Sequence, residues 1–191
     1  MKKTVPVLMM CLFVLFGCTG CVNIIQHTDP ASFNEQSGIE LPEDFSFSIV
    51  WGTYGVSSYD SKSGKLVKTK DASNVGKYTA YVKMSKSELQ TVYRCLFCDL
   101  SLFSYPDSYD PFNAPDAENR IASQPNQTII ISVTANGSTK TVRCDSVAYG
   151  RLDDCYSDEA KAFLSAELEI VNLITSFPEW KAFPEYEYFY E

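Results

Sequence analysis

The chain has 191 residues, which is enough for one compact domain plus a targeting segment. It is 45% hydrophobic and 21% charged, a composition that excludes disordered and collagen-like chains. The formal net charge is −8, and this acidic balance argues against a nucleic-acid surface, which needs basic residues to neutralise phosphates. The chain has one histidine, His27, so most chemistry that depends on histidine is excluded.

The N-terminus has the layout of a secretory signal peptide. A basic start at Lys2 and Lys3 is followed by a mostly apolar run at residues 5–16. This run is shorter than the roughly 20 residues that span a bilayer, which favours a cleaved signal over an uncleaved anchor. We therefore expect residues 1–17 to be removed from the mature protein.

The end of this segment, Leu15-Phe16-Gly17-Cys18, resembles the lipobox of bacterial lipoproteins. In those proteins a leucine, two smaller residues and a cysteine are read by a dedicated signal peptidase. The resemblance implies that Cys18 becomes the lipidated first residue of the mature chain. The chain would then be extracytoplasmic and anchored to a membrane by its lipid, because two or more acyl chains anchor firmly. The resemblance covers residues 1–21 only, and a plain cleaved signal or an uncleaved anchor are the alternatives.

Residues 18–42 are expected to form the lipidated cysteine and a flexible tether. This stretch is polar, contains proline and glycine and has no periodicity, which is typical of a spacer between a membrane and a domain. His27 falls within it, and we interpret it as a solvated side chain because the segment supplies no rigid surroundings for a metal or a catalytic role. A single domain at residues 43–191 should follow.

Three stretches predict strands in the first half of this domain. Residues 45–51 carry an apolar side chain at every second position, which is the period of a half-buried strand. Residues 54–59 and 65–69 form a predicted hairpin around a turn. Residues 78–84 alternate in the same way, so the first half should supply much of a sheet.

Two helices are predicted from their start signals. Ser85 and Glu88 have the spacing of a capping box, and apolar residues within 89–100 then share one helical face. The second helix begins near Ser157, a good N-cap, and Pro178 ends it. Its buried stripe should contain the following apolar residues: Phe163, Ala166, Ile170, Ile174 and Phe177.

The strongest turn signal is the pair at 136–137, Asn-Gly, between the β-rich runs 128–135 and 138–144. Counting back from this turn pairs Ile129 with Cys144, so Cys144 should point toward the core. No strand–helix–strand unit of the parallel type repeats along the chain. We therefore expect an α+β fold, with an antiparallel sheet of about five to six strands and two main helices packed on one face.

Four cysteines lie in the predicted domain: Cys95, Cys98, Cys144 and Cys155. Export makes disulfides available, and four cysteines allow three fully paired connectivities. Cys95 and Cys98 have the spacing of a redox dithiol, but they end a helix, where the dipole does not lower a thiol pKa. On a regular helix both point away from the apolar face. Structural disulfides are favoured over inert thiols, redox-active thiols and a zinc site, in that order.

The segment 101–125 is a long loop with four prolines, and such loops are often functional. Its acidic side chains would suit a hard cation such as Ca²⁺, although their spacing does not match an EF-hand. A solvated acidic loop is the plainer interpretation. The acidic residues are Asp107, Asp110, Asp116 and Glu118.

The C-terminal segment is dense in aromatic residues. The candidates for a binding surface are Trp180, Tyr186, Tyr188 and Tyr190. The favoured interpretation is an extended segment whose rings pack on the domain. An aromatic strip that contacts a partner or a sugar is the alternative, because exposed tyrosine and tryptophan favour interfaces.

No phosphate-binding loop, dinucleotide motif or nucleophile elbow is present in the sequence. We therefore expect a binding module at the cell envelope that uses no cofactor and no metal, rather than an enzyme. Its partners would be the membrane, through Cys18, and an unknown envelope protein or ligand, held at a sheet edge, the 101–125 loop or the aromatic tail. The alternative is an extracytoplasmic enzyme, either a thiol–disulfide oxidoreductase at Cys95 and Cys98 or a carboxylate-based hydrolase.

Overall fold

The computed structural model describes residues 39–69 and 77–185. The predicted signal peptide, Cys18 and His27 lie outside the described residues, as do Tyr186, Tyr188 and Tyr190. Six strands form one antiparallel sheet in the order β4-β3-β2-β1-β5-β6. The strands are β1 (Ser46–Trp51), β2 (Ser57–Asp60), β3 (Lys65–Thr69), β4 (Lys77–Tyr81), β5 (Gln127–Ala135) and β6 (Ser138–Val147).

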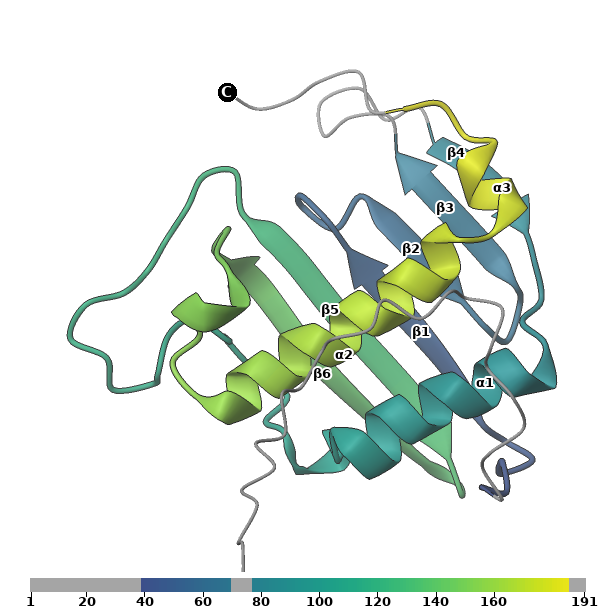
Figure 1. Ribbon diagram of the computed structural model, residues 1–191, viewed down its shortest axis with the longest axis horizontal. Helices are drawn as coiled ribbons and strands as arrows, with labels where there is room; N and C mark the ends of the chain where they lie inside the picture. The colour runs from purple at the N-terminus through teal and green to yellow at the C-terminus, as the bar shows by residue number, and fades with distance from the viewer. Residues whose placement is uncertain (1–38, 70–76, 186–191) are drawn as a thin grey trace, which may run out of the picture. The chain divides into compact units, whose positions relative to one another are not determined.

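The helices α1 (Lys86–Tyr93) and α2 (Asp158–Thr175) lie side by side on one face of this sheet, and the short α3 (Pro178–Lys181) follows α2 (Figure 1). This arrangement confirms the predicted α+β fold. Within the described parts of the chain, no helix is both long enough and apolar enough to cross a membrane.

Alternation along the central strand β1 separates a buried face from an open one. Phe47, Ile49 and Trp51 are buried on the helix side, as the period of two predicts. Ser46 and Ser48 occupy the opposite face, where they pair across strands with other polar residues. The sheet therefore has one apolar face covered by helices and one polar face without a helix, as is common for antiparallel sheets.

The hairpin of β5 and β6 has the predicted register. Ile129 pairs with Cys144, and both are buried. The Asp44 carboxylate accepts hydrogen bonds from the backbone N–H groups of Asn136 and Gly137, at 2.8 and 2.7 Å. These two donors lower the pKa of Asp44, with the Gly137 bond contributing most. The tight turn is thus closed by a carboxylate from the segment that enters β1.

Helix α1 begins with the predicted capping box. The Ser85 hydroxyl accepts from the Glu88 N–H at 3.3 Å, and the Glu88 carboxylate accepts from the Ser85 N–H at 2.6 Å. The helix then widens into a π-helical turn at Arg94–Asp99, in which the Leu100 N–H donates to the Cys95 carbonyl five residues back. A wider turn rotates the following side chains relative to a regular α-helix.

This rotation corrects one prediction about the cysteines. Cys95 was expected to point away from the core, yet its side chain is only 2% exposed, and its thiol lies 3.8 Å from the Ala166 carbonyl of α2. Cys98 is exposed, as expected. The spacing of a regular helix therefore gave the wrong face for Cys95.

Helix α2 starts at the predicted N-cap, where the Ser157 hydroxyl accepts from the Ala160 N–H at 3.1 Å. All five residues of its predicted stripe are buried, although Phe177 lies just beyond the end of the helix. Pro178 follows the end of α2 and occupies the first turn of α3. Two of the last four residues assigned to the tether also contact the domain, because Leu41 packs on the core and Gln90 donates to the Ile39 carbonyl at 3.1 Å.

Candidate functional site

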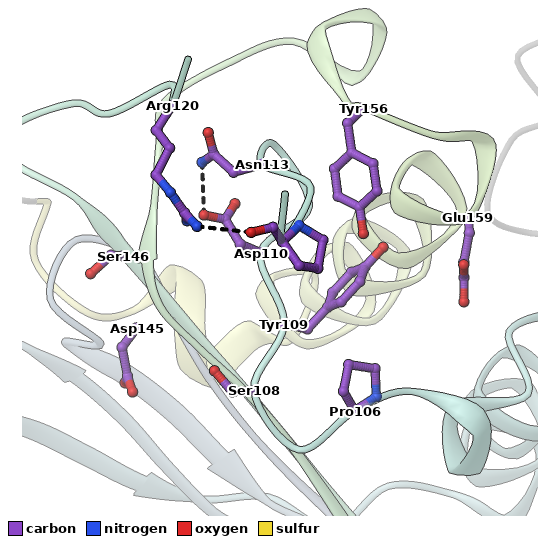
Figure 2. A pocket seen from close by; sticks show the side chains of 11 residues that line it. Pro106, Ser108, Tyr109, Asp110, Asn113, Arg120, Asp145, Ser146, Tyr156 and Glu159 are labelled. Carbon is purple, nitrogen blue, oxygen red and sulfur yellow. Dashed lines mark hydrogen bonds between the residues drawn. The ribbon is translucent and has the colours of Figure 1, made fainter. Parts of the chain in front are cut away.

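A cavity of about 510 Å³ lies between the 101–125 loop, the end of β6 and the connection into α2 (Figure 2). The loop supplies Tyr109 and Asp110, among others. Strand β6 contributes Asp145, and the start of α2 brings Tyr156 and Glu159. The cavity therefore collects side chains from three segments that are distant in the sequence.

Residues 107–109 hold the loop against the edge of β6. Ser108 forms a parallel bridge with Arg143. The Arg143 N–H donates to the Asp107 carbonyl at 2.8 Å, and the Tyr109 N–H donates to the Arg143 carbonyl at 3.0 Å. The carboxylate of Asp107 also lies 2.6 Å from the Lys140 ammonium. This short segment satisfies backbone groups that an edge strand would otherwise leave exposed.

Aromatic rings fix the same part of the loop to α2. The ring of Tyr109 lies 5.0 Å from that of Tyr105 and 5.2 Å from that of Phe163, centroid to centroid, in edge-to-face geometry. The Tyr105 hydroxyl donates to the Glu159 carbonyl at 3.0 Å. Burial raises the pKa of Tyr105 to about 12, with a smaller contribution from Glu159. The wall of the cavity thus rests on the hydrophobic core.

Asn113 closes the outer part of the loop. Its buried side chain donates to the Asp110 carboxylate at 2.7 Å and to the Ile121 carbonyl at 2.9 Å. The Asp110 carboxylate also accepts from the Phe112 N–H at 3.0 Å. These bonds give the loop a defined shape although it contains little regular secondary structure.

The hydroxyl of Tyr109 is the unusual group in the cavity wall. Tyr109 is only 8% exposed, and its hydroxyl oxygen is buried. Figure 2 shows this hydroxyl directed toward that of Tyr156, whose ring centroid lies 6.4 Å from the Tyr109 ring. Burial raises the pKa of Tyr109 above its usual range, and the neighbouring Tyr156 adds to the shift. Tyr109 therefore keeps its proton at physiological pH.

Charges in the cavity are mostly negative. The lining contains three carboxylates, from Asp110, Asp145 and Glu159, and one guanidinium, from Arg120. The Asp145 carboxylate lies 3.0 Å from the Arg143 guanidinium, and both side chains are about half exposed. The Arg120 guanidinium donates to the Pro115 carbonyl at 3.3 Å, as Figure 2 shows.

The acidic residues of the loop do not gather into a metal site. Asp107 is held by Lys140, and Asp110 accepts bonds from within the loop. Asp116 and Glu118 are exposed. Among residues 39–69 and 77–185, no cluster of three or more histidine, cysteine or acidic side chains is arranged to hold a metal ion. Of these four carboxylates, that of Asp110 bonds to other residues of the loop and so holds its shape.

The four domain cysteines are free thiols, so the structure contains none of the disulfides that the sequence favoured. Cys95 and Cys144 are buried, Cys155 is half-buried and Cys98 is exposed. Burial raises the pKa of the Cys95 thiol to about 12 and also raises that of Cys144. A redox-active cysteine needs the opposite shift, because the thiolate is the nucleophile.

Trp180 lies on the periphery of the core. Its ring centroid is 5.4 Å from that of Trp51 and 6.2 Å from that of Phe183. The Lys68 ammonium lies 5.0 Å from the centroid of the Trp180 ring, and its distance to the Glu185 carboxylate is 3.9 Å. Trp180 thereby joins α3 to β1 and β3, whereas the three tyrosines grouped with it lie outside the described residues.

No known protein family and no curated protein matches the chain. The 101–125 loop was recognisable in the sequence, whereas Tyr109, Tyr156 and Glu159 were not recognisable as parts of one site. The sequence held one weak indication that Tyr109 packs on the core. It follows Tyr105 by four residues in a proline-rich loop, and large aromatic rings are usually buried. No local pattern could have linked that ring to the start of α2.

Proposed function

We propose that the chain is a lipid-anchored binding protein of the cell envelope, held to its membrane through Cys18, and that its ligand site is the cavity beneath the 101–125 loop. The observation that carries the binding part is the cavity itself, which brings the exposed ring of Tyr156 together with polar side chains from three segments that are distant in the sequence.

The character of the cavity supports the same proposal. Binding sites combine aromatic side chains with a few convergent polar groups, and Tyr109, Tyr156 and Asp145 supply both kinds. Five of the eight large apolar side chains that are exposed among the described residues belong to the loop and to the β6–α2 connection, and one of them, Tyr156, lines the cavity. The five are Phe103, Ile121, Tyr149, Leu152 and Tyr156. An exposed aromatic side chain at a polar pocket is typical of a binding site.

Catalysis has weaker support. The oxidoreductase alternative needs an accessible thiol of low pKa, whereas Cys95 is buried with a raised thiol pKa and Cys98 is not bonded to it. The hydrolase alternative needs two carboxyl groups free to act on a substrate. In the cavity, Asp110 already accepts two hydrogen bonds and Asp145 is paired with Arg143. Binding is therefore favoured over catalysis.

A photo-crosslinking amino acid in living source cells tests the binding site. One variant carries it in place of Ser146, an exposed residue that lines the cavity. The matched control carries it in place of Ser87, an exposed residue on α1. We expect one discrete adduct, detected by mass spectrometry, at position 146 and none at 87. The same adducts at both positions, or none at either, would show that the cavity is not the binding site.

The anchor is tested by fractionation of the same cells after metabolic labelling with a fatty-acid analogue. Cys18→Ala should remove the label and move the chain from the membrane fraction to the soluble fraction. Cys21→Ala is the matched control and should retain both the label and the membrane association. Label that persists in Cys18→Ala would overturn the assignment of Cys18.

A further inference from the structure

One row of side chains on the helix-covered face of the sheet departs from the apolar pattern of the rest. Trp51 pairs with Ser57 across β1 and β2. The register of β2 and β3 places Ser57 beside Lys68, which in turn pairs with Tyr78 of β4. Ser57 and Lys68 are 1% and 3% exposed, two of the four polar or charged residues that are buried among the described residues. These four neighbours, which we call the Lys68 row, therefore contain a buried ammonium group.

Aromatic rings from the C-terminal part of the chain cover the Lys68 row. The helix α3 lies beside β4 (Figure 1). Its Trp180 ring is 5.4 Å from the Trp51 ring, and the Phe183 ring is 6.0 Å from that of Tyr78, centroid to centroid. The Lys68 ammonium lies 5.0 Å from the centroid of the Trp180 ring. This ring attracts the ammonium group but does not neutralise it, so the buried charge also needs an anion.

Glu185 is one anion that Lys68 reaches, but water competes for it. The Glu185 carboxylate lies 3.9 Å from the ammonium, and its side chain is 94% exposed, whereas that of Lys68 is 4% exposed. A pair with such an exposed carboxylate stabilises little. Buried lysines are usually compensated by shielded partners. Further negative charge at the Lys68 row would therefore be stabilising.

The sequence that follows Glu185 has the charge, the aromatic content and the length that suit this row. Residues 186–191 are Tyr-Glu-Tyr-Phe-Tyr-Glu, with two carboxylates, four aromatic rings and no basic residue. The strands around Lys68 have the opposite charge, because residues 62–86 contain seven lysines and one aspartate. Six extended residues reach at most about 20 Å, which is the width of about four neighbouring strands. This segment is thus complementary to the surface at which it begins.

We propose that residues 186–191 form a strap that crosses this end of the sheet and covers the Lys68 row of the same chain. Glu187 joins Glu185 in pairing with the Lys68 ammonium, and the tyrosine rings pack beside the two tryptophans of the row and of α3. The strap begins at the row, because Glu185 is already within reach of Lys68. This docking surface is separate from the cavity beneath the 101–125 loop, which none of its residues lines.

Tryptophan fluorescence reports on this surface alone, because Trp51 and Trp180 are the two tryptophans of the chain. The full chain in detergent micelles is compared with a chain that ends at Glu185. We expect loss of residues 186–191 to shift the emission to longer wavelength and to raise acrylamide quenching about twofold, because the rings become accessible to water. Identical emission and quenching of the two chains would overturn the proposal.

Single substitutions test the ion pair without shortening the chain. Glu187→Gln keeps the length of the strap but removes a carboxylate, so we expect quenching to rise. The rise should disappear in a Lys68→Met background, in which there is no ammonium group to pair. Lys65→Met, at an exposed lysine of the same strand, is the matched control background and should preserve the rise. A Glu187→Gln variant without any rise, or with the same rise in both backgrounds, would overturn the pairing with Lys68.

Dilution at constant detergent concentration distinguishes a strap of the same chain from one that a second copy supplies. Quenching of the full chain should not change with protein concentration, because an attached segment acts at a fixed effective concentration. Quenching that rises on dilution would show that the segment docks on another copy and would overturn the assignment to the same chain. The crosslink at position 146 probes a different surface, so either proposal can fail while the other stands.

Discussion

The side chain of Asn113 is paired with the backbone of Ile121 through both polar atoms of its amide. Its Nδ2 donates to the Ile121 carbonyl at 2.9 Å, and its Oδ1 accepts from the Ile121 N–H at 2.5 Å. The same Nδ2 donates to the Asp110 carboxylate. One buried amide thus joins two distant parts of the 101–125 loop on the side of the cavity opposite Tyr156 (Figure 2).

Asn113→Ala should therefore loosen the loop without unfolding the sheet. We expect the free energy of unfolding to fall by about 1–3 kcal/mol, because buried partners lose their bonds. Limited proteolysis should cut within the loop sooner, since local opening becomes easier. Asn119→Ala, at an exposed position in the same loop, is the control and should change neither quantity. Identical proteolysis of the two variants would contradict this role.

The turn between β2 and β3 depends on Gly64 for two reasons. Its φ is +76°, and a Cβ at this position would lie 2.8 Å from the Val82 carbonyl oxygen. Gly137 in the β5–β6 turn has a similar φ of +72°, but a Cβ added there would meet no atom within 4 Å. We expect Gly137→Ala to cost about 1 kcal/mol and Gly64→Ala about 2–3 kcal/mol in chemical denaturation. Equal losses would show that the contact with Val82 does not matter.

Glu167 on α2 predicts a pH dependence of stability. Desolvation raises its pKa from 4.5 to about 7 in the folded chain. The folded state therefore binds a proton more tightly than the unfolded state between these values. The contribution of this group to stability is fully present below about pH 4.5 and is lost as the pH rises through about 7. Its charge also helps raise the pKa of the Cys144 thiol, after the larger contributions of burial, Asp110 and Asp145.

Glu167→Gln removes the group whose deprotonation lowers the stability of the folded chain as the pH rises. We expect the variant to be more stable than the wild type at pH 8 by an amount on the order of 2 kcal/mol, and the difference to shrink toward pH 4.5. Glu169→Gln, which removes an exposed carboxylate 3.7 Å from Arg94, should keep the wild-type pH dependence. Denaturant titrations from pH 4 to 8 measure both. A wild-type slope that survives in Glu167→Gln would contradict the assignment.

The cysteines should react with a thiol reagent in the order of their exposure. In the folded chain Cys98 reacts first and Cys155 more slowly, whereas Cys95 and Cys144 react only on unfolding, because both are buried with raised thiol pKa values. Mass-spectrometric mapping of the labelled peptides assigns each site. A peptide pair linked by a disulfide between any two of these residues would contradict the free thiols.

Regular elements of the fold were predictable because local pattern and tertiary burial agree in them. Asn136 and Gly137 fix a two-residue turn, and that turn fixes the register that buries Cys144. Ser85 and Ser157 cap the two main helices as their spacing predicts. In each case a few neighbouring residues determine the outcome.

Two features could not be predicted from local pattern. The π-helical turn after α1 changes the face on which Cys95 lies, and nothing in its six residues distinguishes it from a regular helix. The cavity depends on Asn113, which acts across eight residues, and on Tyr109, whose ring reaches Phe163 on α2. Such contacts follow from the assembled fold rather than from periodicity, so the sequence identified the loop but not the site.

The most direct test of the central claim is the substitution Tyr156→Ala, with stability and ligand capture measured on the same variant. Tyr156 is 41% exposed and lines the cavity, so we expect the free energy of unfolding to fall by no more than about 1 kcal/mol while the adduct at position 146 is lost. Tyr81→Ala, at an exposed tyrosine on β4, is the control and should retain the adduct. A Tyr156→Ala variant that retains the adduct would contradict the account.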